Sequence, residues 1–471
     1  MHMDKIMKRH LLFRILSLAT AVAATACSGA GGGTSITSSV PANEKRAASC
    51  SQGDVQAAVA SAVNGDTVIL PACACGDAPA WTSKIVIPAQ ITIQGSGIQA
   101  TCIQDGGFWA RKPAVGGANN WTVRNILFSR STWSVPPLVI GENTDTGTPV
   151  TGWMITGIGV TGYPVMLLSY NGSTGLVTNS TFTVTGSAAA EILQFYGNEG
   201  ADWASPSSWG SAGTYVFIED NTFACSGSAA NACLHAAMAS RGASMVDRCN
   251  WIVDTGANTS QRWYDVFDVH GYGYQGGSWR SGRQLEVYGN KHTKRYDSGM
   301  FVSPRGGSYR IFTNLIVTGG TSTYADGIIS LGEWRAMNTG NTMMYPLVTG
   351  PAVCSSQTAT TACVVQKTCC ADHEGYPCCD QLGRGAGQTA DPAFAWDNTD
   401  DSSNLLKAGF NGSASPNGCD AACQVFIQAG RDYFDDGTLP AGYAPYTYPH
   451  PARGLAAATT CRTTGITFWR P

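Results

Sequence analysis

A short strand-like motif carrying an asparagine recurs along this chain at unequal intervals. Its copies read VRNILF (123–128), VTNSTF (177–182), VFIEDNTF (216–223), VDRCNWIV (246–253), LEVYGNKHT (285–293) and IFTNLIV (311–317). A repeated unit indicates a stacked architecture, because each unit buries its apolar side only against its neighbours. Asparagine tolerates left-handed backbone and bonds nearby main chain, so we expect it in a turn of each coil. Stacked in successive coils, these asparagines could form a ladder.

A second class of strand alternates with the first. Its copies read VMLLSYNG (165–172), EILQFYGN (191–198), YDVFDVHG (264–271), MFVSPRGG (300–307) and GIISLGEWR (327–335). The chain has 56 glycines among 471 residues and only 13% charged residues, which favours an all-β protein with many turns. The unequal spacing fits a coil whose loops differ in length.

The region before the repeats indicates a cap on such a stack. Val55, Val59 and Val63 recur every four residues and Gly65 follows, which predicts a short amphipathic helix. This helix, followed by GDTVILPAC and ITIQGSG, resembles the entry to proteins of the pectate-lyase-like superfamily. The resemblance covers residues 50–345. It implies a single-stranded right-handed parallel β-helix over residues 49–345, closed by the helix at its N-terminal end.

The repeat pattern fades after residue 345. Residues 346–430 are rich in cysteine and loop-forming residues, and the tail that follows is rich in proline and tyrosine. We expect residues 346–471 to form a Cys-rich loop region and a C-terminal tail that pack on the β-helix.

The first residues have the pattern of an export signal. Lys5, Lys8 and Arg9 precede an apolar stretch that ends in small residues before Cys27. The segment resembles a bacterial lipoprotein signal (1–26), with Ala24 where leucine is usual. That resemblance implies lipidation of Cys27 and a flexible tether over 27–48, anchored to the cell envelope. The alternative is an ordinary secretory signal, cleaved near Ala26.

Export bears on the cysteines. Of the 17 in the chain, 16 remain when Cys27 is set aside, an even number that suits disulfides in an oxidising compartment. Zinc is the alternative for Cys369, Cys370, Cys378 and Cys379, with His373 nearby. We favour disulfides and predict no structural metal.

The candidate site centres on the strand YDVFDVHG. Side chains alternate along a strand, so Phe267 and Val269 should point inward while Asp268 and His270 point outward together. If Gly271 aligns with Gly306 in the next coil, Arg305 stacks over His270. Glu333 could continue this row, and His235 lies one coil earlier as a further candidate for the same groove.

Basic residues concentrate in the same part of the sequence. Residues 1–26 carry four basic residues and one acidic one, and removing them leaves 25 basic and 31 acidic side chains, a formal charge of −6. A mildly acidic chain is a poor general binder of nucleic acid. Seven of the 25 basic residues lie between 279 and 310: Arg280, Arg283, Lys291, Lys294, Arg295, Arg305 and Arg310. Such a local patch suits an anionic ligand.

A uronate polysaccharide fits these residue types. β-Elimination needs a cation beside the C5 carboxylate, a base for the C5 proton and an acid for the O4 leaving group. We assign the cation to Arg305 or Arg283, the base to His270 and the acid to Tyr264 or Tyr288. Asp268 could orient His270 or hold Ca²⁺, and no cofactor is otherwise required. The expected substrate-binding residues are Trp279, Arg280, Tyr288, Lys294, Arg295 and Glu333.

Comparison of motifs refines the class of enzyme. Asp268-Val269-His270 is similar to the Asp-Pro-His motif of alginate C5-epimerases, with Val in place of Pro. The Gly-His-Gly and Arg-x-Lys motifs of polygalacturonases are not present around His270. We therefore expect an exported, monomeric polysaccharide lyase or C5-epimerase. The alternative is a non-catalytic surface β-helix for glycan binding or adhesion, in which these charges and tyrosines only decorate or pack the outside.

Overall fold

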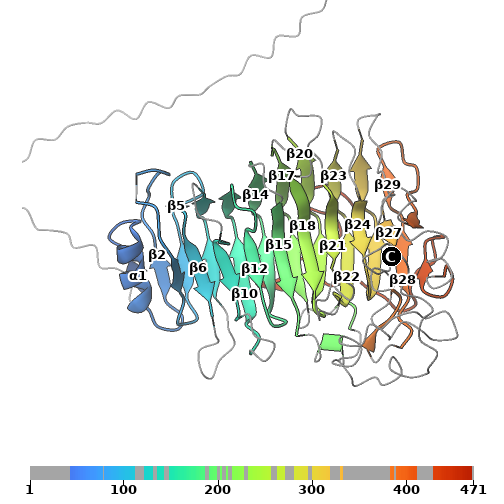
Figure 1. Ribbon diagram of the computed structural model, residues 1–471, viewed down its shortest axis with the longest axis horizontal. Helices are drawn as coiled ribbons and strands as arrows, with labels where there is room; N and C mark the ends of the chain where they lie inside the picture. The colour runs from blue at the N-terminus through green and yellow to red at the C-terminus, as the bar shows by residue number, and fades with distance from the viewer. Residues whose placement is uncertain are drawn as a thin grey trace, which may run out of the picture. The chain divides into compact units, whose positions relative to one another are not determined.

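The chain winds into coils, and the strands of successive coils pair to form three long parallel sheets (Figure 1). Strands that follow one another along the chain belong to different sheets. This computed structural model describes residues 43–77, 79–111, 121–130, 135–142, 148–185, 190–198, 202–203, 208–210, 215–227, 232–255, 263–270, 281–294, 300–318, 329–331, 382–386, 389–410 and 428–468. Every registered strand pair within the three sheets is parallel, as between β10 (Thr151–Thr156) and β13 (Thr174–Thr178). The predicted all-β parallel β-helix is confirmed.

Sheet 1 is the twelve-stranded sheet. Its strands are β1 (Glu44–Arg46), β2 (Thr67–Ile69), β4 (Thr92–Gln94), β7 (Thr122–Arg124), β10, β13, β16 (Val216–Glu219), β19 (Ser244–Arg248), β22 (Gln284–Tyr288), β25 (Ser308–Phe312), β28 (Ala393–Trp396) and β31 (Tyr433–Phe434).

Sheet 2 has nine strands and sheet 3 has ten. Sheet 2 holds β5 (Cys102–Gln104), β8 (Leu127–Ser129), β11 (Gly159–Thr161), β14 (Thr181–Val184), β17 (Thr222–Cys225), β20 (Trp251–Asp254), β23 (Lys291–Thr293), β26 (Leu315–Val317) and β29 (Thr399–Asp400). Sheet 3 holds β3 (Lys84–Val86), β6 (Gly107–Ala110), β9 (Leu138–Ile140), β12 (Leu167–Ser169), β15 (Ala190–Tyr196), β18 (Cys233–Ser240), β21 (Asp265–Val269), β24 (Met300–Pro304), β27 (Ile329–Leu331) and β30 (Ala408–Phe410).

Helix α1 (Gln52–Ala60) closes the N-terminal end. The Ser51 side chain accepts a hydrogen bond from the Asp54 amide, which caps the helix, and Val55 and Val59 are fully buried. The helix ends before Val63, whose side chain is 65% exposed. The predicted third valine of the apolar stripe is therefore outside both the helix and the core.

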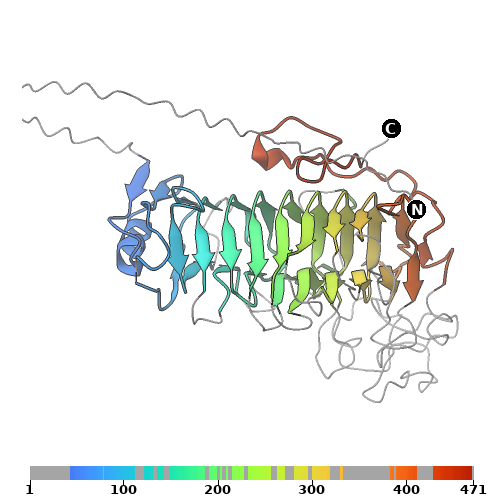
Figure 2. The ribbon, with the colours of Figure 1, turned by 90° about the horizontal axis from the view of Figure 1, so that it is seen from above.

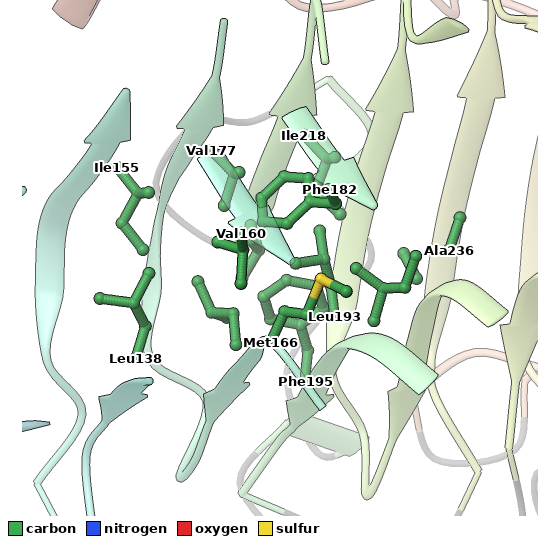
Figure 3. Close-up of a cluster of buried hydrophobic side chains, with 14 of the residues drawn as sticks. Leu138, Ile155, Val160, Met166, Val177, Phe182, Leu193, Phe195, Ile218 and Ala236 are labelled. Carbon is green, nitrogen blue, oxygen red and sulfur yellow. The ribbon is translucent and has the colours of Figure 1, made fainter. Parts of the chain in front are cut away.

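The interior is filled by rows of apolar side chains, one from each coil. On sheet 3 the registered residues Phe108, Leu138, Leu167 and Leu193 form one such row, and all are fully buried. Figure 3 shows Leu138 and Leu193 in the same interior as residues of the other two sheets, such as Val160 and Ile155. Each row buries its side chains only because the next coil covers it.

A ladder of asparagines follows the turn between sheets 1 and 2. Each side chain donates to the next one at 2.9–3.1 Å, in the order Asn221, Asn250, Asn290, Asn314 and Asn398. The residue before each has left-handed backbone, with φ between 51° and 64°. The expected ladder is confirmed for these coils.

Two of the repeat asparagines take a different place. Asn125 and Asn179 occupy the left-handed position itself, with φ of 60° and 50°. Ser180 fills the ladder position after Asn179, and its amide donates to the Asn221 side chain at 3.0 Å. Asparagine suits both positions, so in these two copies of the motif it stands one residue before the ladder position.

The coil stack continues beyond residue 345, because β28 to β31 join the same three sheets. Residues 437–468, here called the C-terminal strap, then run along one side of the stack (red in Figure 2). The strap lies on the outer face of sheet 1: Tyr443 donates to Glu286 at 2.6 Å, and Arg248 donates to the Tyr446 carbonyl at 2.7 Å.

Disulfides join four pairs of cysteines in the described residues. They are Cys50–Cys73, Cys75–Cys102, Cys225–Cys233 and Cys249–Cys461. The last one fastens the strap to the turn after β19. The cysteines weighed as zinc ligands, 369, 370, 378 and 379, lie outside the described residues, as do the signal, Cys27 and residues 28–42 of the predicted tether. The last part of that tether is described and is not a free linker, because Glu44–Arg46 form β1 and pair with β2 in sheet 1.

Candidate functional site

The outer face of sheet 3 carries the candidate site, and an irregular alternation sets which side chains reach it. In β21 both Val266 and Phe267 are fully buried in the core, and Val269 is also buried there. Asp268 and His270 are left on the outer side, as predicted. Since two consecutive core residues precede Asp268, Asp265 is outward as well.

Asp268 and His270 form a hydrogen-bonded pair. His270 Nδ1 lies 2.7 Å from Asp268 Oδ2. A carboxylate only accepts, so Nδ1 carries the proton, and in the neutral ring Nε2 is then the unprotonated nitrogen. The pair therefore presents a base on the side of the ring away from Asp268.

Arg305 joins the pair from the next coil. Val269 is registered with Pro304, so the residue after Pro304 stacks beside His270, as expected from the glycine alignment. Its Nε lies 3.2 Å from Asp268 Oδ1, and its Nη2 donates to Asp265 Oδ2 at 3.4 Å. One guanidinium thus bridges two carboxylates.

His235 enters from the preceding coil. Its Nδ1 lies 3.0 Å from the Asp265 carbonyl oxygen and its Nε2 lies 3.8 Å from Asp268 Oδ2. Together Asp265, Asp268, His270, His235 and Arg305 make up what we call the sheet-3 cluster.

Burial separates the pKa values of the cluster. Asp265 loses solvation and faces the Asp268 charge, which together raise its pKa to about 6. Burial alone would raise the Asp268 pKa too, but Arg305, His235 and His270 hold it well below its usual range. Burial, assisted by Arg305, lowers the pKa of His270 to about 4. Two adjacent carboxyls pushed in opposite directions are typical of acid and base roles.

The sheet-3 cluster has little contact with solvent. Asp265 and Asp268 are 0% exposed, Arg305 6% and His270 9%. His270 is the most exposed member of the cluster, although its Nε2 atom is itself buried. In such surroundings charge interactions are stronger than in water.

A strip of aromatic and polar side chains continues the same face toward the N-terminal end. The rings of Tyr170 and Tyr196 stack at 5.5 Å, and the Arg241 guanidinium lies 5.0 Å from the centre of the Tyr196 ring. The Tyr196 hydroxyl donates to Gln194 at 3.0 Å, and Gln194 donates to Glu191. Stacked tyrosines beside hydrogen-bonding groups form a surface on which sugar rings can lie.

The basic residues of 279–310 that the structure describes do not form one patch. Arg305 is on the face of sheet 3, Lys291 lies in β23 of sheet 2, and Arg310 is on the outer face of sheet 1, where its guanidinium lies 3.8 Å from the Trp209 ring centre. Consecutive strands of a coil face three directions, so neighbours in sequence separate in space. The predicted basic patch is wrong for these residues.

Other predicted site residues also move away from the sheet-3 cluster. Tyr288, expected as an acid, is fully buried under the strap, where it accepts from Arg248 at 2.8 Å and stacks on Phe312. Lys294 follows β23 of sheet 2, where its amide donates to the Val317 carbonyl. Both assignments are corrected: these residues belong to other faces.

Arg283 and Tyr264 each directly precede a strand, β22 of sheet 1 and β21 of sheet 3. Arg283 precedes β22, and its Nη1 donates to the Asp202 carbonyl at 2.6 Å. Glu286, three residues further along, accepts instead from Tyr443 and from the Gly210 amide. Tyr264 directly precedes β21, and its carbonyl accepts from the Met300 amide. Trp279, Arg280, Arg295 and Glu333 lie outside the described residues.

Metal-ligating side chains do not gather in the described part of the chain. No group of three or more His, Cys, Asp or Glu side chains there could hold a metal ion. Asp268, considered for Ca²⁺, already contacts Arg305 and His270 with its two oxygens. The described residues also contain no helix with the length and hydrophobicity needed to cross a membrane.

Asp265 is the cluster member that sequence reasoning missed. Strict alternation from Asp268 would place it inside. The signal was present in the second class of strand, where two adjacent apolar residues recur before the outward residue: Met166-Leu167, Ile192-Leu193, Ala236-Ala237, Val266-Phe267 and Phe301-Val302. This local break in alternation turns the preceding side chain outward.

Comparison with known proteins assigns no family: no family model, no curated protein and no solved structure matches the chain.

Proposed function

We propose that this protein is a polysaccharide lyase or C5-epimerase that removes the C5 proton of a uronate unit. The observation that carries the proposal is the convergence of Asp265, Asp268, His270 and Arg305 from two adjacent coils. The stacked coils resemble those of pectate-lyase-like proteins, and we propose that the chain is related to them.

The base is His270. Its proton on Nδ1 is held by Asp268, so Nε2 is the nitrogen that would accept the C5 proton. A carboxylate hydrogen-bonded to the far ring nitrogen fixes the tautomer and stabilises the imidazolium that forms. This arrangement assigns Asp268 the orienting role.

Asp265 is the acid, in place of the tyrosines first considered. Its raised pKa keeps a larger share of the carboxyl protonated near pH 6 than an ordinary aspartate would. In elimination, the C4–O4 bond breaks as His270 takes the C5 proton, Asp265 protonates O4, and a C4–C5 double bond remains. In epimerisation, a proton returns to C5 from the opposite face instead.

Arg305 supplies the positive charge. Its guanidinium already bridges Asp265 and Asp268, and protonation of Asp265 releases part of that charge for the substrate carboxylate. A uronate whose carboxylate is paired has a more acidic C5 proton. Substrate binding and proton abstraction therefore depend on the same protonation step.

Deuterium exchange tests this chemistry without knowledge of the final product. Acidic polysaccharides (alginate, polygalacturonate and glycosaminoglycans) are incubated with the protein in D₂O. Deuterium at C5 is followed by NMR, and unsaturated product by absorbance at 235 nm. We expect wild type to produce at least one signal and His270→Ala to produce neither. Lys291→Ala, in the same coil but on sheet 2, is the matched control and should behave as wild type. Absence of both signals from wild type on every polymer would sink the enzymatic proposal.

A non-catalytic glycan-binding protein is the second candidate. The Tyr170–Tyr196 strip favours it, because the strip extends the surface beyond what a single reacting sugar needs. This candidate predicts that wild type and His270→Ala bind an acidic polysaccharide with equal affinity and that neither exchanges the C5 proton.

We further propose that the protein acts outside the cytoplasm, as a monomer with a polysaccharide partner. The disulfides among the described residues support an oxidising compartment. Labelling with a radioactive fatty acid, lost in Cys27→Ser, tests the lipid anchor on the cell envelope.

A further inference from the structure

A polar cavity opens beside the tyrosine strip, at the corner where the chain passes from sheet 3 to sheet 1. Its volume is about 150 Å³, roughly the share of five waters in the liquid. The lining residues that matter here are Tyr196, Asp202, Ser208, Ser244, Arg283 and Gln284.

Asp202 is held in place by its surroundings. The Arg283 guanidinium donates to its carbonyl at 2.6 Å, and the Asn198 amide donates to its carboxylate at 2.6 Å. The next residue, Trp203, is buried and donates to the Ser281 carbonyl at 3.1 Å. The Asn198 amide fixes the carboxylate and Arg283 fixes the main chain that carries it, so the group is positioned before a ligand arrives.

Gly242 allows this arrangement. Its φ is +86°, and a β-carbon there would lie 2.8 Å from the Asp202 side chain. A larger residue would therefore push the carboxylate out of its position. The cavity depends on glycine at this corner.

The charges that line the cavity balance one another. Among the described lining residues, Asp202 is the one carboxylate and Arg283 the one cationic side chain, and they carry opposite signs. A uronate carboxylate placed here would face Asp202 with no surplus positive charge. Neutral sugar hydroxyls, by contrast, could donate to Asp202 and exchange hydrogen bonds with Ser208, Ser244 and Gln284.

The strand register sets the distance to the sheet-3 cluster. Tyr196 is registered with Ser240, and Ala239 with Val269, so His270 lies two strands from Tyr196 on the same face. Two strand spacings are about 10 Å. A glycan with one unit at His270 can extend along the face to reach this corner.

We infer that this cavity binds a neutral, hydroxyl-bearing sugar unit of the same glycan, so the preferred substrate is a heteropolysaccharide in which neutral sugars lie within two units of the uronate. The inference rests on the proposed function for the position of the uronate. The cavity itself is defined by residues outside the sheet-3 cluster.

Binding to matched polymers tests the inference. The exported form of the full protein is assayed by affinity electrophoresis in two pairs of gels: gellan against polyglucuronate, and rhamnogalacturonan against polygalacturonate. The first member of each pair contains neutral sugars and the second contains only the uronate. We expect wild type to bind the first member of at least one pair about tenfold more tightly.

Two variants probe the cavity by different means. Asp202→Ala removes the acceptors, and Ser244→Phe fills the space without changing a charge. Both should abolish the tenfold preference while leaving affinity for the uronate-only polymer within twofold. Thr92→Phe, at the start of another sheet 1 strand, is the matched control and should retain the preference. Thermal melting confirms that each variant is folded, and if Asp202→Ala is not, Ser244→Phe decides.

The outcomes separate this inference from the proposed chemistry. No preference in wild type, or a preference that survives both folded variants, overturns the neutral-sugar subsite, even if C5 exchange and elimination are observed. A preference lost in the variants supports the subsite, even if no C5 exchange occurs, in which case only the catalytic proposal fails.

Discussion

Asp268 Oδ2 lies 2.7 Å from His270 Nδ1, on a strand whose intervening residue is buried in the core. The contact fixes the ring so that Nε2 is the unprotonated nitrogen. Because Arg305 also binds Asp268, the carboxylate stays ionised and the imidazole stays neutral at neutral pH. The relationship between these two residues is therefore directional, with Asp268 orienting and His270 reacting.

Replacement of Asp268 by asparagine tests this direction. Asp268→Asn keeps the size of the side chain but removes the charge that selects the Nδ1 proton. We expect the C5 exchange rate to fall by roughly 10²–10⁴, the usual contribution of general acid–base catalysis. NMR of the ring nitrogens should show the tautomer changing in the variant. An unchanged exchange rate together with an unchanged tautomer would contradict the orienting role.

The reaction should have an optimum on the acidic side of neutrality. Below pH 4, His270 becomes protonated and can no longer accept a proton, since its pKa is lowered to about 4. Above pH 6, Asp265 loses the proton it must donate, since its pKa is raised to about 6. Initial rates at 235 nm across pH 3–9 should therefore be highest between about 4 and 6. A rate that rises steadily toward pH 9 would rule out these assignments.

Asp265→Asn should separate the two halves of the reaction. An amide cannot protonate O4 effectively, so elimination should fall by roughly 10²–10⁴. His270 and Asp268 are untouched, so C5 exchange should stay within about tenfold of wild type. Equal loss of both signals would instead place Asp265 in substrate binding or in the structure of the site.

The sequence predicted the fold better than it predicted the site, and particular residues explain why. Stacking and alternation depend on local patterns, so the paired strands and the outward placement of Asp268 and His270 could be read from short motifs. Aligning Gly271 with Gly306 also predicted that Arg305 of the next coil lies beside His270. Tyr288 and Lys294 were misassigned because a β-helix sends consecutive strands to different faces. Asp265 was missed because two adjacent core residues interrupt the alternation.

The asparagine ladder should carry measurable stability. Asn290 accepts from the Asn250 amide at 2.8 Å and donates to Asn314, all in a buried turn. Asn290→Ala leaves the Asn250 amide without its acceptor, and each such buried group costs about 1–3 kcal/mol. Denaturant unfolding should show that the free energy of unfolding falls by about 1–3 kcal/mol or more. Asn221→Ala should show a similar loss, and a change under about 0.5 kcal/mol in both would refute the role.

Release of the strap should reduce stability but leave the chemistry intact. The Cys249–Cys461 disulfide closes a span of 212 residues and fastens the strap to sheet 1, away from the sheet-3 face. Cys461→Ser should lower the free energy of unfolding by about 2–5 kcal/mol. C5 exchange at 25 °C should remain within twofold, provided the variant is folded. A selective loss of exchange would show that the strap acts on the site.

Asp247 should make the protein less stable as the pH rises. Its side chain lies in an inward row between Ile218 and Val287, and within the described residues neither carboxyl oxygen has a hydrogen-bond partner. Burial raises its pKa well above the usual value. The folded state therefore binds this proton more tightly than the unfolded chain, so stability is lost from about pH 4 upward until the folded-state pKa is passed.

Removing the carboxyl should remove that slope. Asp247→Leu places an apolar side chain among apolar neighbours and should raise the free energy of unfolding, by about 1–3 kcal/mol for the unsatisfied polar group alone. The gain should be larger at pH 7 than at pH 4, as measured by urea unfolding at both values. Asp66→Leu, a buried aspartate whose carboxylate accepts from the Val63 amide at 3.0 Å, is the matched comparison and should be destabilising. If Asp247→Leu destabilised the protein at both pH values, the carboxyl would have to have a partner in the folded state, and the account of a buried neutral aspartate would be wrong.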